Sequence, residues 1–170
     1  MNTSKNASDR APDGSNGYGH GSPIITVVAT AAAALFLNLV IYGLGRAAGG
    51  DFRFTASGQP AEVDALTVAG FTVLPLLVGM TAVAVLTRIR PWVVPAALVV
   101  APAIALGTIL VMTIPADFDD TSKITLALCH VMLVPVTVAG LLRLRGQRHG
   151  QAAADPDIAE TTPPRPGGQP

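Results

Sequence analysis

Charged side chains are scarce in this 170-residue chain, and four long stretches contain none. Asp, Glu, Lys and Arg make up 13% of the residues, against roughly 25% in a typical soluble domain. The four charge-free stretches are residues 24–45, 65–87, 92–114 and 124–142. A helix in any of them has no charged face to present to water, so the sequence argues against a water-soluble domain.

Other absences exclude whole classes of function. Cys129 is the only cysteine, so an intrachain disulfide is impossible. The formal net charge is zero, so we expect no nucleic-acid partner. The charge-free stretches offer no carboxylate for exchanging a proton against a cation, which argues against a proton-coupled multidrug exporter. No nucleophile–base–acid set and no metal-ligand cluster stands out, so we expect no enzymatic activity, no catalytic residue, no cofactor and no metal.

What the sequence does contain is enough apolar chain for four membrane spans. The hydrocarbon core of a bilayer is about 30 Å thick, so a helix needs about 20 apolar residues to cross it. The four stretches have 22, 23, 23 and 19 residues. The first is also longer than the apolar region of a cleaved signal peptide, which has about 7–15 residues. The sequence therefore predicts an all-α membrane protein, an antiparallel bundle of four transmembrane helices with disordered termini.

The predicted membrane domain covers residues 23–146. The flanking segments 1–22 and 147–170 are rich in Gly, Pro and polar residues, which predicts two disordered tails. Spans two and three are separated only by the turn Arg88–Pro91, so they form an antiparallel hairpin of neighbours.

The longest connection is predicted to carry a short extended segment. Residues 51–55 alternate in polarity, and residues 57–60 have turn chemistry. We expect this segment to lie on the rim of the bundle.

The distribution of Lys and Arg predicts a multi-pass protein of the cell membrane with both termini in the cytoplasm. In that orientation the cytoplasmic side holds eight basic residues and the outer side holds three. The cytoplasmic eight are Lys5, Arg10, Arg88, Arg90, Arg143, Arg145, Arg148 and Arg165. The outer three are Arg46, Arg53 and Lys123.

Polar side chains within the spans are few, and four of them fall at a common depth. Asn38 and His130 lie about 10 Å below the outer surface at the helical rise per residue, and Thr72 and Thr108 lie within about one turn of that depth. These residues could act as hydrogen-bonding contacts between packed helices. Alternatively, they could line a small polar cavity in which His130 is the titrating group. In either arrangement we expect Asn38 and His130 to face each other.

Three prolines form a second layer near the middle of the membrane. Pro75, Pro102 and Pro135 each remove a backbone donor and kink their helix. Membrane helices tolerate such kinks, which either shape the bundle or act as hinges.

The acidic segment before the last span, residues 117–120, resembles the opening of a calcium-binding loop. The glycine and the bidentate glutamate of such a loop are missing, and Leu128 stands at the glutamate position. We expect helix capping by Asp120, Thr121 or Ser122 instead.

This layout resembles a family of uncharacterised four-helix membrane proteins of high-GC bacteria, classed as a domain of unknown function. The resemblance covers about residues 22–146. It rests on the four apolar spans, the tight basic turn and the last span, which reads LALCHVMLVP over residues 126–135 and closes with AGL over residues 139–141. The His–Val pair at positions 130 and 131 is its most specific element. The family implies this shape but no activity.

Two classes of function remain open. The first is a non-catalytic accessory or assembly component that acts through helix packing, with the lipid bilayer and other membrane proteins or a second copy of itself as partners. The second is a small transporter or pore subunit that uses the outer polar layer around His130.

Overall fold

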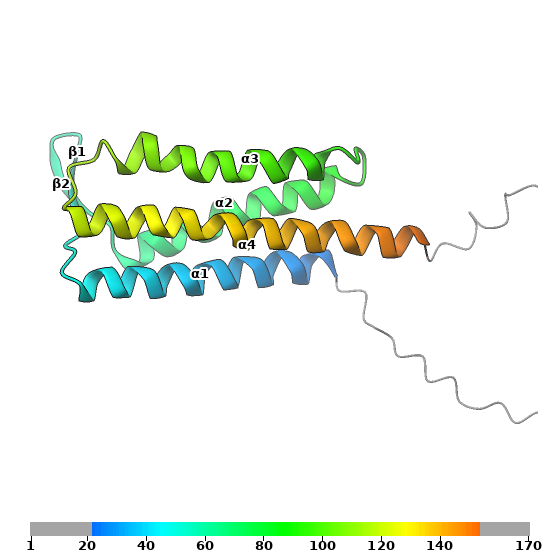
Figure 1. Cartoon of the computed structure of the whole chain (residues 1–170), viewed down its shortest axis with the longest axis horizontal. Coiled ribbons are helices and arrows are strands. Elements are labelled where there is room, and N and C mark those ends of the chain that lie inside the picture. Colours follow the sequence, from blue (N-terminus) through cyan, green and yellow to red (C-terminus); the bar gives the residue numbers. More distant parts are fainter. Residues whose placement is uncertain (1–21, 154–170) are drawn as a thin grey trace, which may run out of the picture.

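The computed structural model describes residues 22–153, which form four long helices and one β-hairpin (Figure 1). The elements in chain order are α1 (Pro23–Ala47), β1 (Arg53–Ala56), β2 (Gln59–Glu62), α2 (Ala65–Leu86), α3 (Val93–Thr108) and α4 (Asp120–Ala153). The third helix continues into a π-helical turn, η1 (Ile109–Thr113). By length and composition, all four helices are apolar enough to cross a membrane, which indicates a multi-pass membrane protein.

The four expected apolar helices are present, and two expectations need correction. The domain is not purely α-helical, because the connection between α1 and α2 forms a two-stranded antiparallel hairpin. The expected C-terminal tail begins too early at residue 147, because α4 continues to Ala153. Gln147 and Arg148 belong to this extension and bond to other helices, which explains why the helix does not end with the apolar stretch. The expectations for residues 1–21 and 154–170 lie outside the described residues.

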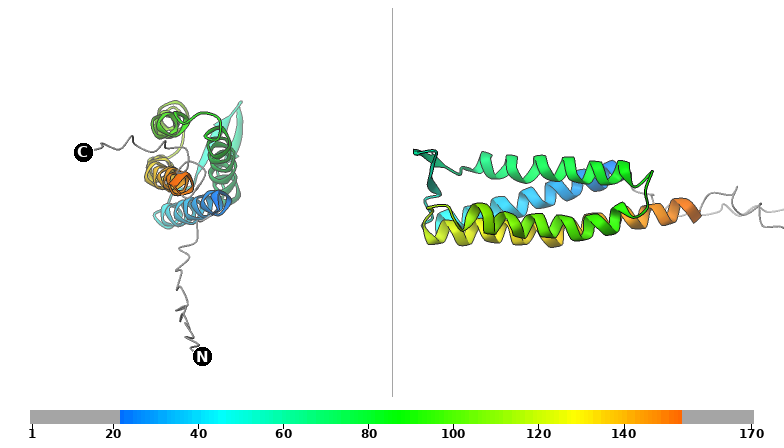
Figure 2. Two further views of the ribbon diagram at one scale, coloured as in Figure 1. Left: turned by 90° about the vertical axis from the view of Figure 1, so that its right-hand side faces the viewer. Right: turned by 90° about the horizontal axis from the view of Figure 1, so that it is seen from above.

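The helices run up and down in sequence around a common axis (Figure 2). Helix α1 packs extensively against both α2 and α4, and α3 packs mainly on α4. By contrast, α2 and α3 contact each other little, although a short turn joins them. The bundle is therefore tight on the α1 side and open between α2 and α3.

Two glycines bring α1 and α4 close together. A Cβ atom placed on Gly140 of α4 would lie 2.6 Å from Thr30 Oγ1 of α1 and 2.8 Å from the end of the Met80 side chain. A Cβ atom placed on Gly45 of α1 would lie 2.4 Å from Thr125 Oγ1 of α4. Real Cβ atoms do not approach so closely, so a side chain at either position would push the two helices apart.

The hairpin covers one end of the bundle (Figure 1). Its two-residue turn consists of Ser57 and Gly58, which both have positive φ angles, of 51° and 75°. This geometry matches the twist of the paired strands and accounts for the glycine. Just before β1, Phe52 has a φ of 57° and a fully buried side chain, with its ring centroid 4.7 Å from that of Tyr42. The phenyl ring of Phe52 closes this end of the bundle.

Three side chains from the start of α4 and the loop before it hold the hairpin in place. The Phe52 N–H donates to Ser122 Oγ at 2.9 Å, and the Thr55 N–H donates to an oxygen of Asp117 at 2.8 Å. Asp119 accepts from the Asp51 N–H at 3.3 Å and from the Ser122 N–H at 3.0 Å. Hydrogen bonds from Ser122, followed by those from Asp51, lower the pKa of Asp119.

The capping residue of α4 is therefore Asp119, not Asp120, Thr121 or Ser122. Its carboxylate accepts from the backbone N–H three residues later, which is the bonding pattern of an N-cap. The acidic segment thus anchors the hairpin and starts a helix.

The packing of α1 on α4 predicts that the same substitution changes the free energy of unfolding differently at two helical glycines. Gly140→Ala should lower the free energy of unfolding by about 1–3 kcal/mol, the usual cost of overpacking. Gly79→Ala in α2 is the matched control, because a Cβ atom there has nothing within 4 Å. Circular dichroism during thermal unfolding in detergent gives the midpoint for each of the two variants. Equal midpoints for the two variants would contradict the close approach of α1 and α4.

Candidate functional site

A cavity of about 300 Å³ lies beneath the hairpin and is lined by side chains from all four helices. Apolar groups make up most of its wall, including Val68, Leu126 and Leu133 from the helices and Phe54 and Ala61 from the hairpin. A volume of this size is at the lower end of the range for small-molecule sites, which is about 300–1,000 Å³. The cavity is therefore a candidate binding site.

All four residues of the polar layer inferred from depth counting line this one cavity. They are Asn38 from α1, Thr72 from α2, Thr108 from α3 and His130 from α4. One residue thus comes from each helix. The cavity also has polar groups that the sequence did not single out, at Glu62 of the hairpin and Thr67 and Thr113 at the helix ends.

Asn38 is the most deeply buried member of the layer, with 2% of its surface exposed. Its Nδ2 donates to Thr72 Oγ1 at 2.9 Å and so links α1 to α2. The thiol of Cys129 in α4 donates to the backbone oxygen of Asn38 at 3.8 Å. Asn38 therefore contacts both helices that flank α1.

The side-chain oxygen of Asn38 has no partner. Asn38 Oδ1 is buried and accepts no hydrogen bond within the described part of the chain. Leaving a buried acceptor unsatisfied costs about 1–3 kcal/mol. A ligand donor that reached this oxygen after a small movement of neighbouring side chains would recover that free energy, so Asn38 is a candidate for recognising a ligand.

The other two members of the layer bond within their own helices. His130 Nδ1 lies 2.8 Å from the Leu126 carbonyl, and Thr108 Oγ1 donates to the Ile104 carbonyl at 2.8 Å. Because a carbonyl only accepts, Nδ1 carries a proton and Nε2 of a neutral His130 is left as an acceptor. No hydrogen bond joins Asn38 to His130 among residues 22–148, although both line the cavity, and the expectation that they face each other stays a prediction.

The proline layer lies outside this cavity. Pro75, Pro102 and Pro135 are interior residues of α2, α3 and α4, and none belongs to the cavity lining. The irregular element at the site is instead the π-helical turn η1, from which Met112 and Thr113 line the cavity. Such turns often occur at functional sites. Hydropathy cannot reveal them, because they leave the composition of the span unchanged.

The arrangement can bind a molecule through hydrogen bonds and apolar contacts. In the part of the chain that the structure describes, no group of three or more His, Cys, Asp or Glu side chains could hold a metal ion. The polar groups of the lining are separated by apolar side chains and come from different elements. These are the properties of a binding pocket with a few orienting groups.

The bond between Asn38 and Thr72 predicts a measurable coupling. The substitutions Asn38→Leu and Thr72→Val keep approximate shape and remove the bond, so their double-mutant cycle should give a coupling of about 0.6 kcal/mol, the mean for such bonds in membranes. The cycle of Asn38→Leu with Thr108→Val is the control and should give no coupling, since Thr108 bonds within its own helix. Unfolding free energies in mixed micelles provide both values. A coupling in the control that equals the first would contradict the assignment.

A family model matches most of the chain, including all four helices up to Gln147. It covers residues 20–147 and describes a family of unknown function, DUF6069. No curated protein and no solved structure matches the chain. The matched region contains the hairpin and every residue of the cavity lining. The chain belongs to the family of unknown function DUF6069.

Proposed function

We propose that this chain is a non-catalytic accessory component of the cell membrane that binds a small, uncharged amphipathic molecule in the cavity beneath its hairpin. The observation that carries the proposal is the convergence of one polar side chain from each helix on a cavity with an unpaired buried acceptor, Asn38 Oδ1. The protein would act through its packed helices, because side chains from all four helices form most of the wall of the cavity.

The properties of the lining define the ligand class. Apolar walls favour a hydrocarbon body, and the unpaired Asn38 oxygen favours a hydrogen-bond donor such as a hydroxyl group. A charged headgroup is disfavoured because transferring a charge from water into this environment is costly. A long-chain alcohol or a monoacylated glycerol has the required combination of groups.

The ligand would enter sideways from the lipid. Phe71 of α2 and Met112 of η1 both line the cavity, yet 75% and 64% of their surfaces are exposed. The cavity thus reaches the outer face of the bundle between two successive helices that contact each other little. In a membrane this face would lie against acyl chains or against the helices of another membrane protein or a second copy.

The hydrogen bonds that the polar groups already make favour a binding role over a catalytic one. Thr108 and His130 are already bonded to carbonyls of their own helices, and Asn38 is bonded to Thr72. General acid–base catalysis needs a positioned proton donor and acceptor at the reacting atoms. The lining supplies orienting groups for a ligand.

A photoreactive octan-1-ol carrying a diazirine tests this proposal. In nanodiscs it should label peptides that contain the cavity lining, and excess octan-1-ol should suppress the labelling. Thr108→Trp fills the cavity and should lower labelling several-fold. Leu110→Trp should leave it unchanged, because Leu110 is exposed and does not belong to the lining. Labelling spread over all lipid-facing residues, with no competition, would reject the cavity as a binding site.

We propose that the hairpin faces outward and that both termini are cytoplasmic. The arginines of the turn between α2 and α3 and of the end of α4 support this orientation, because basic residues near the spans favour the cytoplasmic side.

Reporter fusions test the orientation. Alkaline phosphatase, which is active only outside the cytoplasm, should be active when inserted after Gly58 in the hairpin turn. It should be silent when fused after Ala153 at the end of α4, where a fluorescent protein should instead be bright. The reverse pattern would overturn the orientation and leave the cavity itself unaffected.

A second candidate function is a small transporter or pore subunit. The interior prolines of three helices favour it, because kinked helices can act as hinges. Against it, Val27, Met80 and Leu144 pack together in the interior on the side of the cavity away from the hairpin. Proteoliposome swelling in glycerol or urea decides between the two functions. A flux above that of protein-free liposomes, lost in His130→Ala, would favour transport over binding alone.

A further inference from the structure

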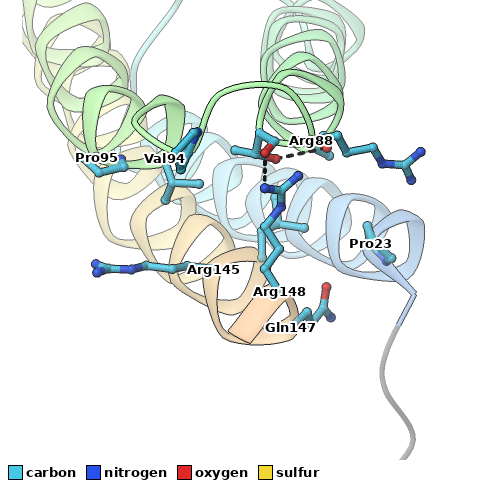
Figure 3. Close-up of a pocket in the computed structure, with 11 residues that line it drawn as sticks. Pro23, Arg88, Val94, Pro95, Arg145, Gln147 and Arg148 are labelled. Atoms are coloured by element: carbon cyan, nitrogen blue, oxygen red, sulfur yellow. Dashed lines mark hydrogen bonds between the residues drawn. The ribbon is translucent and has the colours of Figure 1, made fainter. Parts of the chain in front are cut away.

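A second cavity, of about 650 Å³, lies at the end of the bundle opposite the hairpin (Figure 3). Its walls come from the last turn of α2, the turn between α2 and α3, the start of α3, the end of α4 and the first residue of α1. Three arginines, Arg88, Arg145 and Arg148, belong to the lining. The remaining wall is largely apolar and includes Val94, Pro95 and Leu144.

This end of the molecule is positively charged within the described residues. The arginines here are Arg88, Arg90, Arg143, Arg145 and Arg148. The acidic residues of the described range all belong to the hairpin, its flanks, the loop before α4 and the first residue of α4, and they are Asp51, Glu62, Asp64, Asp117, Asp119 and Asp120. The cavity therefore combines positive charge with apolar walls, and the described part of the chain supplies no neutralising carboxylate at this end.

Arg148 is the arginine that points into the cavity. Figure 3 shows its side chain reaching from α4 toward the turn between α2 and α3, while Arg88 and Arg145 point outward on either side. Its guanidinium donates to the Thr87 carbonyl, at the C-terminal end of α2. A guanidinium has five N–H donors, so this contact leaves donors for an anion.

A second, independent feature at this cavity also indicates a ligand. Gln147 lines it and donates from Nε2 to Thr26 Oγ1 at 2.8 Å, which holds the side chain in place. Its Oε1 is buried and accepts no hydrogen bond from residues that the structure describes. A hydroxyl group would satisfy this oxygen once a small side-chain rotation opened it to the cavity, whereas a bare anion without a proton would not.

A tryptophan beside the cavity indicates that the cavity would lie at the level of a membrane surface. Trp92 precedes α3 at this end and has 63% of its surface exposed. Tryptophan side chains at helix ends are enriched at the interface between lipid headgroups and water. The cavity would thus be next to phospholipid headgroups, with the acyl chains alongside α2 and α3.

We propose that this cavity binds the headgroup of an anionic phospholipid. Arg148 would bond the phosphate from within the cavity, and Arg88 and Arg145 would turn toward it from the rim. Gln147 Oε1 would accept a bond from a headgroup hydroxyl, and the apolar wall would contact the start of the acyl chains. The apolar wall favours a lipid over free phosphate, which would gain nothing from it.

Native mass spectrometry of the full chain released from nanodiscs tests this site. The probes are phosphatidylglycerol, which is anionic and carries hydroxyl groups, and phosphatidylcholine with the same acyl chains. The wild type should retain phosphatidylglycerol in preference to phosphatidylcholine. Arg148→Gln should lower this preference about fivefold, the factor that corresponds to about 1 kcal/mol for one basic residue at an anionic membrane surface.

Two further variants separate lipid binding from folding. The double variant Arg88→Gln, Arg145→Gln removes only outward-pointing side chains and should lower the preference by at least the same factor with an unchanged unfolding midpoint. Arg53→Gln at the hairpin is the charge-matched control and should have no effect, since Arg53 belongs to the opposite end. An unchanged preference in the double variant would overturn the proposal. Displacement of the lipid by millimolar inorganic phosphate would also overturn it, in favour of a free-phosphate site.

Discussion

The contact between α1 and α4 determines how the other helices can pack. Gly45 on α1 and Gly140 on α4 each face a threonine of the other helix, at opposite ends of the pair. Because both positions lack a side chain, the two backbones approach closely along most of the membrane thickness. In lipid there is no hydrophobic driving force between helices, so such close packing is a main source of their association.

The remaining helices attach to this pair from different sides. Helix α2 packs on α1 and α3 packs on α4, so the side chains between α2 and α3 do not close the bundle. At the hairpin end this leaves the cavity around Asn38, and at the arginine end it leaves the cavity around Arg148. In the middle, Met80 of α2 reaches Gly140 and separates the two cavities. Both candidate sites thus follow from the same asymmetry of packing.

The sequence predicts the helices well because the hydrocarbon core imposes a length and forbids charge. Depth along a helix can be inferred equally well, because each residue adds a fixed rise. The sequence could therefore assign Asn38, Thr72, Thr108 and His130 to a common layer. Rotation about the helix axis is harder to infer. These helices are apolar on every face, so no amphipathic pattern shows which neighbour each side chain meets. For this reason the sequence could not predict that Asn38 bonds to Thr72 of the neighbouring helix.

The features outside the spans were less predictable for a different reason. The alternation over residues 51–55 indicated an extended segment, but its partner strand Gln59–Glu62 has a proline at its second position and little strand character. What fixes the hairpin is a set of long-range bonds to Asp117, Asp119 and Ser122. Such bonds join residues more than 60 positions apart, and a single sequence holds no local pattern for them.

The two cavities share one property, a lining residue with a buried amide oxygen that has no hydrogen-bond partner in the described part of the chain. Within the described residues, two buried side-chain atoms lack a hydrogen-bond partner, Asn38 Oδ1 and Gln147 Oε1. Each belongs to a side chain whose nitrogen is already bonded across a helix interface, so neither amide can rotate to satisfy its oxygen without losing that bond. Each also lines one of the two cavities. Native proteins rarely leave such acceptors unpaired. Both amides therefore favour ligands that carry a hydroxyl donor. At the Arg148 cavity the arginines also favour a negatively charged ligand, whereas the Asn38 cavity has no such preference.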